Sequence, residues 1–195
     1  QTTLMKTVVV CGGGALGSHV LWLGRGLEVN WIVIDDDRVE TKNLGSQWFV
    51  KQMLGKQKAQ ALKAQMQNFT GRKIEALAVR LRANNVEELL ARADLVVDCF
   101  DNAASRQLVQ EFVREKGIPC LHGGLAADGT FGAVRWDSRF VIDSEDIPGQ
   151  ATCEVGGFLP LIVRVSACLV EAIQEWLAEE SERNWNVSQT SSESF

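Results

Sequence analysis

Three glycines near the start of the chain have the spacing of a loop that binds phosphate. Gly12, Gly14 and Gly17 form a G-x-G-x-x-G pattern, directly after a β-branched run at 7–11 and before a helical segment. In such a loop, two glycines allow a tight turn and the close approach of a phosphate, and the third allows close packing of the helix. The first backbone amides of the helix then bind the anion. The pattern therefore predicts a phosphate-binding loop.

Charged side chains after this loop indicate which phosphate compound it binds. Asp35 ends a second apolar run, about 20 residues past the glycines, where a carboxylate is expected to bind ribose hydroxyls. Asp37 follows it, and an acidic cluster beside a phosphate loop is repulsive unless a cation lies between them. Lys58, at the start of a helix, is placed to neutralise phosphate oxygens, and Asp101, after the third parallel strand, to hold Mg²⁺. We therefore expect a metal–nucleotide complex rather than a redox cofactor.

An NAD-binding module is the alternative interpretation of the glycine loop. A dehydrogenase also needs a proton-transfer residue and a substrate region, and the histidines are His19 and His122. We expect His19, in the first helix, to be structural. His122 ends a strand, where ligands bind in open sheets, and stays a candidate. The chain has little length left for a substrate domain.

The elements that position these residues alternate along the first two thirds of the chain. Strands are expected at 7–11, 31–35, 73–81, 95–99 and 119–122, and helices at 15–24, 56–68, 86–93 and 103–116. This alternation predicts an α/β fold with a mainly parallel sheet and helices on both faces.

The pattern changes in the last third of the chain. Residues 129–136 and 139–143 alternate like antiparallel strands, and an irregular stretch at 144–157 precedes a long helix at 159–180. That helix is apolar on more than one stripe, so we expect it to be buried in the core or against a partner subunit. We expect one domain over 1–181 and a polar, disordered tail over 182–195.

Composition argues against several classes of protein. A net charge of −5 argues against a nucleic-acid partner. The five cysteines lack any C-x-x-C spacing, which fits neither a disulfide framework nor a zinc site and predicts a reducing, cytoplasmic compartment. We expect no membrane segment, because glycines and polar residues interrupt the apolar run at 8–23.

Four motifs in order resemble the ThiF/MoeB family of adenylyltransferases that activate ubiquitin-like proteins. They are G-x-G-x-L-G-S from Gly12, D-x-D-x-V-x-x-x-N-L-x-x-Q from Asp35, G-x-x-K-A from Gly55 and D-x-x-D-N-x-x-x-R from Asp98. The resemblance covers about residues 7–180 and implies a Rossmann-like fold with an antiparallel extension. It also implies a crossover loop before the final helix, and commonly a homodimer.

The resemblance implies a role for individual residues. Asp35 would bind the ATP ribose, Asn43 and Lys58 the phosphates, and Asp101 would coordinate Mg²⁺. Asp37 and Gln47 belong to the same nucleotide motif, whereas Asn102 and Arg106 would be supporting residues. The implied reaction adenylates the C-terminal glycine carboxylate of a β-grasp protein, either a ubiquitin-like protein or a sulfur carrier. Cys153 lies where some members carry an acyl or sulfur intermediate, and is otherwise a small loop residue.

Two departures from the family pattern leave other functions open. Position 46 is serine where the family usually has a phosphate-binding arginine, so Lys51, Lys56 or a partner subunit would have to supply the cation. The paired C-x-x-C zinc motifs of many members are missing, so no zinc is expected. The alternatives are a non-catalytic partner subunit, or a related enzyme that adenylates a peptide or a tRNA base.

Overall fold

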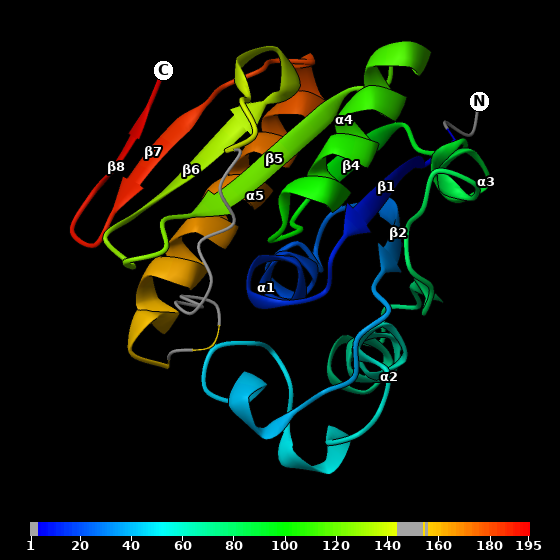
Figure 1. The fold of residues 1–195 in the computed structure, drawn as a ribbon, viewed down its shortest axis with the longest axis vertical. Helices are drawn as coiled ribbons and strands as arrows, with labels where there is room; N and C mark the ends of the chain where they lie inside the picture. The colour runs from blue at the N-terminus through cyan, green and yellow to red at the C-terminus, as the bar shows by residue number, and fades with distance from the viewer. Residues whose placement is uncertain (1–3, 144–153, 155) are drawn as a thin grey trace.

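A computed structural model of the chain describes residues 4–143, 154 and 156–195. Its centre is a sheet of eight strands in the order β3-β2-β1-β4-β5-β6-β7-β8 (Figure 1). The strands are β1 (Lys6–Cys11), β2 (Val29–Ile34), β3 (Glu75–Leu77), β4 (Leu95–Asp98), β5 (Cys120–Leu125), β6 (Phe131–Trp136), β7 (Trp185–Ser188) and β8 (Ser192–Ser194). Neighbours from β3 to β5 are parallel, and neighbours from β5 to β8 are antiparallel. The predicted α/β class and antiparallel extension are confirmed.

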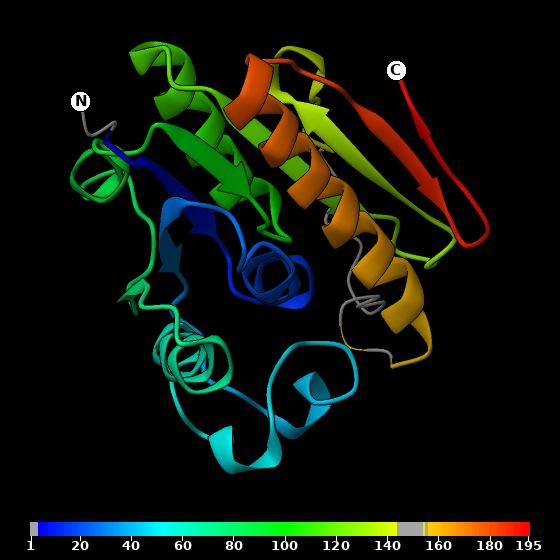
Figure 2. The same cartoon turned by 180° about the vertical axis from the view of Figure 1, so that it is seen from behind.

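Helices cover both faces of the sheet, as predicted. They are α1 (Ala15–Leu23), α2 (Lys58–Thr70), α3 (Val86–Leu90), α4 (Ala103–Lys116) and α5 (Leu159–Glu179), with short 3₁₀ turns η1 (Thr41–Asn43), η2 (Lys51–Met53), η3 (Asp137–Arg139) and η5 (Gly156–Phe158). In Figure 1, α4 lies in front of the sheet, and the reverse view in Figure 2 shows α5 crossing its other face beside α1. Two apolar cores result, one on each face.

Strand β1 shows why the parallel strands consist of uninterrupted runs of apolar residues. Val8 and Val10 pack into the core shared with α1, α2 and α5, whereas Val9 and Cys11 pack into the core shared with α3 and α4. A strand buried on both faces has no polar alternation, which is typical of parallel sheets. In the register, Cys11 lies opposite both Ile34 and Asp98, so the carboxyl ends of β1, β2 and β4 meet at one edge.

Two predictions about the last third of the chain are wrong. The strand expected at 139–143 is absent: Arg139 ends the turn η3 and residues 140–143 form no strand, because β6 already pairs with β5 on one edge and with β7 on the other. The tail at 182–195 is not disordered: β7 and β8 extend the sheet, and Trp185 and Val187 of β7 are buried. Asn184 anchors the start of this hairpin, because its side-chain oxygen accepts a hydrogen bond of 2.9 Å from the Trp136 amide.

The long helix α5 is apolar because it belongs to the core. By length and composition, Gly156–Glu179 is the one stretch of the described residues that is long and apolar enough to cross a membrane. Here its residues Ile162, Val165, Leu169 and Ile173 are fully buried in the core that the helix shares with α1 and the sheet. The predicted burial of this helix is confirmed.

Candidate functional site

The glycine loop joins β1 to α1 and has little room for side chains. Gly12 has a φ of +96°, and a Cβ there would lie 2.9 Å from the Cys99 carbonyl oxygen. A Cβ on Gly17 would lie 1.7 Å from the carbonyl oxygen of Gly12. The loop can therefore hold its shape only with glycine at these two positions, one for backbone conformation and one for close packing. Helix α1 begins directly after Gly14, so its first amides face the carboxyl edge of the sheet.

Asp35 fixes this loop to the end of β2. Its Oδ2 accepts a hydrogen bond of 2.7 Å from the Gly13 amide, and its Oδ1 accepts one of 2.7 Å from the Asp37 amide. Burial raises the pKa of this carboxyl, and the two amides partly oppose that rise. Each carboxylate oxygen keeps a further lone pair for a ligand. Asp35 is therefore both a structural link and a possible acceptor for hydroxyl groups.

The acidic residues after β2 lie close to a lysine. Carboxylate oxygens of Asp35, Asp36 and Asp37 all lie within 4.8 Å of one another. The Nζ atom of Lys58, the first residue of α2, lies 3.8 Å from Asp37 Oδ2, and the Lys58 side chain is only 8% exposed. Because the lysine is confined in this way, its ammonium group is held against the acidic cluster at the mouth of the loop.

A cavity of about 1280 Å³ brings the predicted residues together at the carboxyl edge of the sheet. Its lining includes these predicted residues: Gly12, Gly14, Asp35, Asp37, Asn43, Gln47, Lys58 and Asp101. Gly17 packs below the loop and is not in this lining, and Cys153 lies outside the described residues. Pockets for one small molecule span roughly 300–1000 Å³, so this cavity has room for more than a nucleotide.

The cavity also has an apolar half that the sequence motifs did not indicate. It is lined by Leu125, Ala126, Ala127, Phe131, Phe140, Val141 and Ile142. These residues belong to the end of β5, the turn that follows it, the start of β6 and the segment after η3. The polar half with the glycine loop and this apolar half are therefore continuous.

Supporting residues hold the two polar turns of the cavity in place. Asn43 is buried, and its Oδ1 accepts a hydrogen bond of 2.8 Å from the Glu40 amide. Asn102 begins α4 by accepting a hydrogen bond of 2.9 Å from the Ser105 amide. Arg106 Nη1 lies 3.1 Å from Asp98 Oδ2, and its other terminal nitrogen donates to the Gly123 carbonyl. The contact of Asn43 holds the turn η1, and those of Asn102 and Arg106 position the turn that carries Asp101.

Serine 46 does not face the cavity. Ser46 is fully buried, and its carbonyl accepts a hydrogen bond of 2.8 Å from His19 Nε2. His19 Nδ1 in turn accepts one of 2.9 Å from Trp22 Nε1, which fixes the neutral tautomer, and burial lowers the pKa of this imidazole. The expected structural role of His19 fits these contacts.

The basic side chains at the cavity differ from those that the sequence suggested. Lys56 lines a separate, smaller pocket between η2 and α2, and Lys51 is exposed on η2. The cations in the described lining are Arg38, Lys42, Lys58, Arg80 and Arg106. Lys42 Nζ lies 2.8 Å from Glu154 Oε1 and 3.3 Å from Glu40 Oε2, so it joins η1 to the segment before α5.

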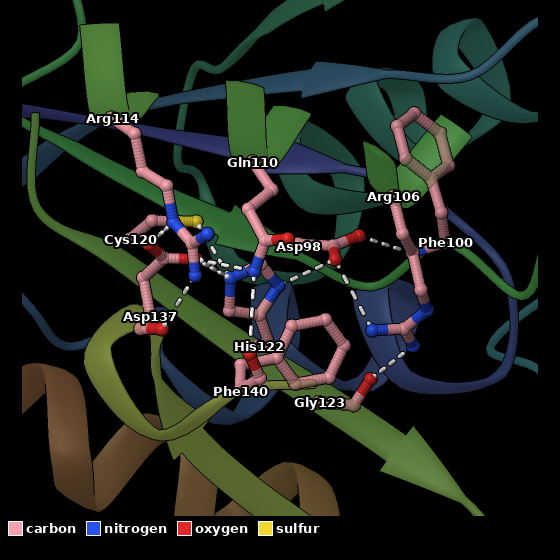
Figure 3. A network of polar contacts seen from close by, with 10 residues as sticks. All are labelled: Asp98, Phe100, Arg106, Gln110, Arg114, Cys120, His122, Gly123, Asp137 and Phe140. Carbon is pink, nitrogen blue, oxygen red and sulfur yellow. Dashed lines mark hydrogen bonds and ion pairs between the residues drawn. The ribbon is translucent and has the colours of Figure 1, made fainter. Parts of the chain in front are cut away.

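His122 is the centre of a polar network behind the cavity (Figure 3). The fourth motif contains two members of this network, Asp98 and Arg106, but did not indicate that they surround His122. His122 lies on β5 between Asp98, at the end of β4, and Asp137 in η3. The sequence offered one signal. His122 and Asp98 are polar residues at the ends of two apolar strands that were expected in the core of the sheet. The partner Asp137 could not be found from the sequence, since 139–143 was expected to continue as a strand.

Comparison with known proteins agrees with the geometry. A model described as the ThiF family matches residues 1–188. The adenylyltransferase and sulfurtransferase UBA4 of Meyerozyma guilliermondii is 32% identical over 180 residues, which cover 87% of this chain and 42% of that protein. The sulfur carrier protein adenylyltransferase of Thermus thermophilus is 35% identical over 122 residues, which cover 61% of this chain and 45% of that protein. The chain thus spans less than half the length of these relatives.

A solved structure shares the fold at low sequence identity. The crystal structure of Escherichia coli MccB with ATP superposes with a TM-score of 0.79 at 16% identity, over 97% of this chain and 63% of that chain. At this level of identity, the likeness supports the arrangement of strands and helices.

Proposed function

The chain belongs to the ThiF family, and we propose that it uses ATP to adenylate the C-terminal glycine carboxylate of a β-grasp protein, either a ubiquitin-like protein or a sulfur carrier. One observation carries this proposal. The glycine loop, Asp35, Lys58 and Asp101 line a single cavity that continues into an apolar half. A nucleotide fits the polar half, and an extended peptide tail fits the apolar half.

The donor atoms at the cavity suit a magnesium–nucleotide complex. Mg²⁺ prefers carboxylate and other oxygen ligands and is usually held by one or two carboxylates together with substrate phosphates. Asp101 and the cluster Asp35–Asp37 supply such oxygens at the polar half. We propose that Asp101 holds the ion, which would neutralise phosphate charge when bound. Asp35 would accept the ribose hydroxyls, and Asn43, Gln47 and Lys58 would bind phosphates.

The chemistry requires positioning and charge neutralisation. An oxygen of the acceptor carboxylate attacks the α-phosphorus of ATP, and the bond from that phosphorus to the oxygen bridging the α- and β-phosphates breaks. The products are an acyl-adenylate and pyrophosphate, with no net transfer of a proton. The chain's own residues bind the triphosphate at the α1 amides and at Lys58, and hold the acceptor in line. Transfer of the acyl group to Cys153 would be a later step.

Lys42 is our candidate for the cation that is missing at position 46. Lys42 directly precedes the turn that contains Ser46, in which the Ser46 and Gln47 amides both donate to the Asn43 carbonyl. Lys42 lines the cavity, whereas Ser46 is buried away from it. The lysine is held at the cavity mouth by Glu40 and Glu154, which phosphates would replace as partners.

We extend the proposal to the assembly and compartment of the protein. A homodimer is supported by exposed apolar side chains, among them Val50, Leu54 and Phe69. The aromatic series Trp22, Trp48 and Phe69 ends at the exposed ring of Phe69. A cytoplasmic location is supported by the free thiols of Cys11, Cys99, Cys120 and Cys168. The net charge of −5 makes nucleic acid an unfavourable partner.

The test is exchange of labelled pyrophosphate into ATP in the presence of candidate β-grasp proteins and Mg²⁺. We expect exchange that depends on an intact C-terminal glycine, and a loss of about a hundredfold in Asp101→Ala. Glu75→Gln serves as the control, because it removes only the ion pair between Glu75 on β3 and Arg92. Absence of exchange with every partner, while Asp101→Ala leaves ATP binding unchanged, would contradict the proposal.

A non-catalytic partner subunit is the second candidate, and the buried Ser46 favours it. A pseudoenzyme could lose the phosphate-binding arginine without losing the fold. Calorimetry of MgATP with the isolated chain separates the two functions. Binding of MgATP by the chain favours the enzyme, whereas tight binding to a second ThiF-like chain without nucleotide binding favours the partner subunit.

A further inference from the structure

His122 lies between two carboxylates in the interior of the protein (Figure 3). Its Nδ1 is 2.6 Å from Asp98 Oδ2, and its Nε2 is 2.8 Å from Asp137 Oδ1. The imidazole is buried, as is Asp98, and the ring of Phe140 stacks on it with a centroid distance of 3.8 Å and an interplanar angle of 8°. Both ring nitrogens are therefore committed to acceptors.

These two contacts favour the charged form of the ring. A neutral imidazole carries one N–H, so it can donate to one carboxylate only and turns a lone pair toward the other. The imidazolium donates to both. Burial lowers the pKa of His122, but the hydrogen bonds to Asp137 and Asp98 outweigh it, and the net pKa is raised.

Other charged and titratable groups around His122 match this assignment. Arg106 on α4 pairs with Asp98, and Arg114 on α4 lies 2.8 Å from Asp137 Oδ2. Gln110 Nε2 donates a hydrogen bond of 3.1 Å to the other oxygen of Asp137, Oδ1. Cys120 Sγ lies 3.5 Å from Nε2, and burial raises the pKa of this thiol. Arg135 is the cross-strand neighbour of His122 on β6, and its guanidinium bonds to β7 instead. The two carboxylates are thus held by cations on β5 and α4.

The network reaches the cavity on two sides. Asp98 Oδ1 accepts a hydrogen bond of 3.0 Å from the Phe100 amide, which fixes the turn that carries Asp101. On the other side, Phe140 leaves η3 and begins the wall 140–143 of the cavity. Arg106 closes the arrangement, with its guanidinium carbon 5.3 Å from the centre of the Phe140 ring.

We propose that His122 is a positioning residue for the adenylation reaction, whose imidazolium ties the Asp101 turn to the Phe140 wall and so sets the width of the cavity between them. The proposal rests on the proposed function. His122 does not touch the nucleotide, because it lies behind Phe140 and is not among the cavity-lining residues. It acts through Asp98 and Asp137.

The charge on the ring is measured without any activity assay. The chain has two histidines, so ¹⁵N-histidine labelling gives two imidazole spin systems, and His19→Gln assigns them. We expect His122 to give an imidazolium spectrum at pH 7 and His19 to give a neutral Nε2–H spectrum. A neutral spectrum for His122 at pH 7 would overturn the proposal.

The positioning role is measured through the pH profile of MgATP binding. Asp137→Asn keeps the shape of the partner and removes one charge, so the His122 pKa should fall and the alkaline limit of tight binding should fall with it. Glu87→Gln is the matched control, since it also removes an ion pair to α4, with Lys116. His122→Gln, which can donate to one carboxylate only, should weaken binding about tenfold at pH 7 if it folds.

The outcomes separate the two proposals. An alkaline limit that stays in place in Asp137→Asn, while the spectra show that the His122 pKa has fallen, overturns the positioning role. If the wild-type chain binds no MgATP at any pH, both the proposed function and the positioning role are contradicted. The spectra still show in that case whether His122 carries a charge.

Discussion

The carboxylate of Asp35 and the amide of Gly13 are joined by a hydrogen bond of 2.7 Å between the end of β2 and the glycine loop. The same carboxylate accepts a second amide, from Asp37. The residue expected to bind ribose is thus also the residue that shapes the phosphate loop. Binding and folding are coupled at this position.

Asp35→Asn should therefore lower both stability and affinity. The asparagine side chain has one acceptor oxygen, so one of the two amides loses its partner, at a cost of about 1–3 kcal/mol in the free energy of unfolding. Urea unfolding measures the loss, and MgATP binding should weaken in parallel. Asp36→Asn is the control for stability alone, because Asp36 is exposed and surface substitutions usually change stability by less than about 0.5 kcal/mol. Equal stability of the two variants would contradict this account.

The glycines of the loop should differ sharply in how well they tolerate substitution by alanine. In Gly17→Ala the new Cβ would lie 1.7 Å from the Gly12 carbonyl oxygen, so α1 must move away, and we expect a loss of about 3 kcal/mol and of MgATP binding. In Gly14→Ala the Cβ meets Gln47 Oε1 at 3.8 Å, an ordinary contact, and the fold should persist. Thermal unfolding of both variants checks the contrast, with Gly26→Ala, which meets nothing within 4 Å, as reference.

Lys42→Ala should weaken MgATP binding about tenfold, which is the effect of losing one charged contact to phosphate. Glu154→Gln removes a competing partner of the same ammonium and should strengthen binding. Lys51→Ala, on exposed η2, should leave the affinity unchanged. Calorimetry at low salt checks all three. If Lys42→Ala bound like the wild type, another cation would hold the phosphates.

The stability of the chain should fall at both alkaline and acidic pH, because His122 and Asp137 titrate in these ranges. The raised pKa of His122 contributes stability that is full below its unfolded value of 6.5 and is lost as pH rises through the folded value. Burial raises the pKa of Asp137, but hydrogen bonds from His122, Arg114 and Gln110 outweigh it and lower it to about 2. That contribution is present above 3.8 and is lost as pH falls toward 2.

Urea unfolding across pH measures both contributions. In Asp137→Asn the alkaline loss should begin at lower pH than in the wild type, because His122 has lost its Nε2 acceptor charge. Glu87→Gln should keep the wild-type profile. If the wild type and Asp137→Asn showed the same dependence of unfolding free energy on pH, the His122–Asp137 pair would not contribute to stability.

The parallel part of the fold could be predicted because its signals are local. The helix at 103–116 ends at Gly117, which takes a φ of +68°, and its predicted bounds match α4. The glycine loop, Asp35 and Lys58 are positioned by the ends of β1, β2 and α2, and the order of these elements is fixed by the alternation along the chain. Their meeting at one cavity follows from the rule that ligands bind beyond the carboxyl ends of parallel strands.

The remaining features depend on contacts between distant segments. Strand β7 has only two inward apolar residues, so its polar sequence resembles a tail until the free edge of β6 is known. Phe140 alternates with its neighbours like a strand residue, yet its ring stacks on His122. The pairing of His122 with Asp137 joins two side chains that face each other only because β5 and β6 are antiparallel.

Helix α5 has a consequence for how the protein is made. It is hydrophobic enough to resemble a membrane anchor, and it is synthesised after β5 and β6, the strands on which it packs. Until it docks on β5 and β6, a nascent chain presents to chaperones and to the insertion machinery a segment that the finished protein hides. Slower synthesis or lower temperature should raise the soluble yield, because docking then competes better with aggregation.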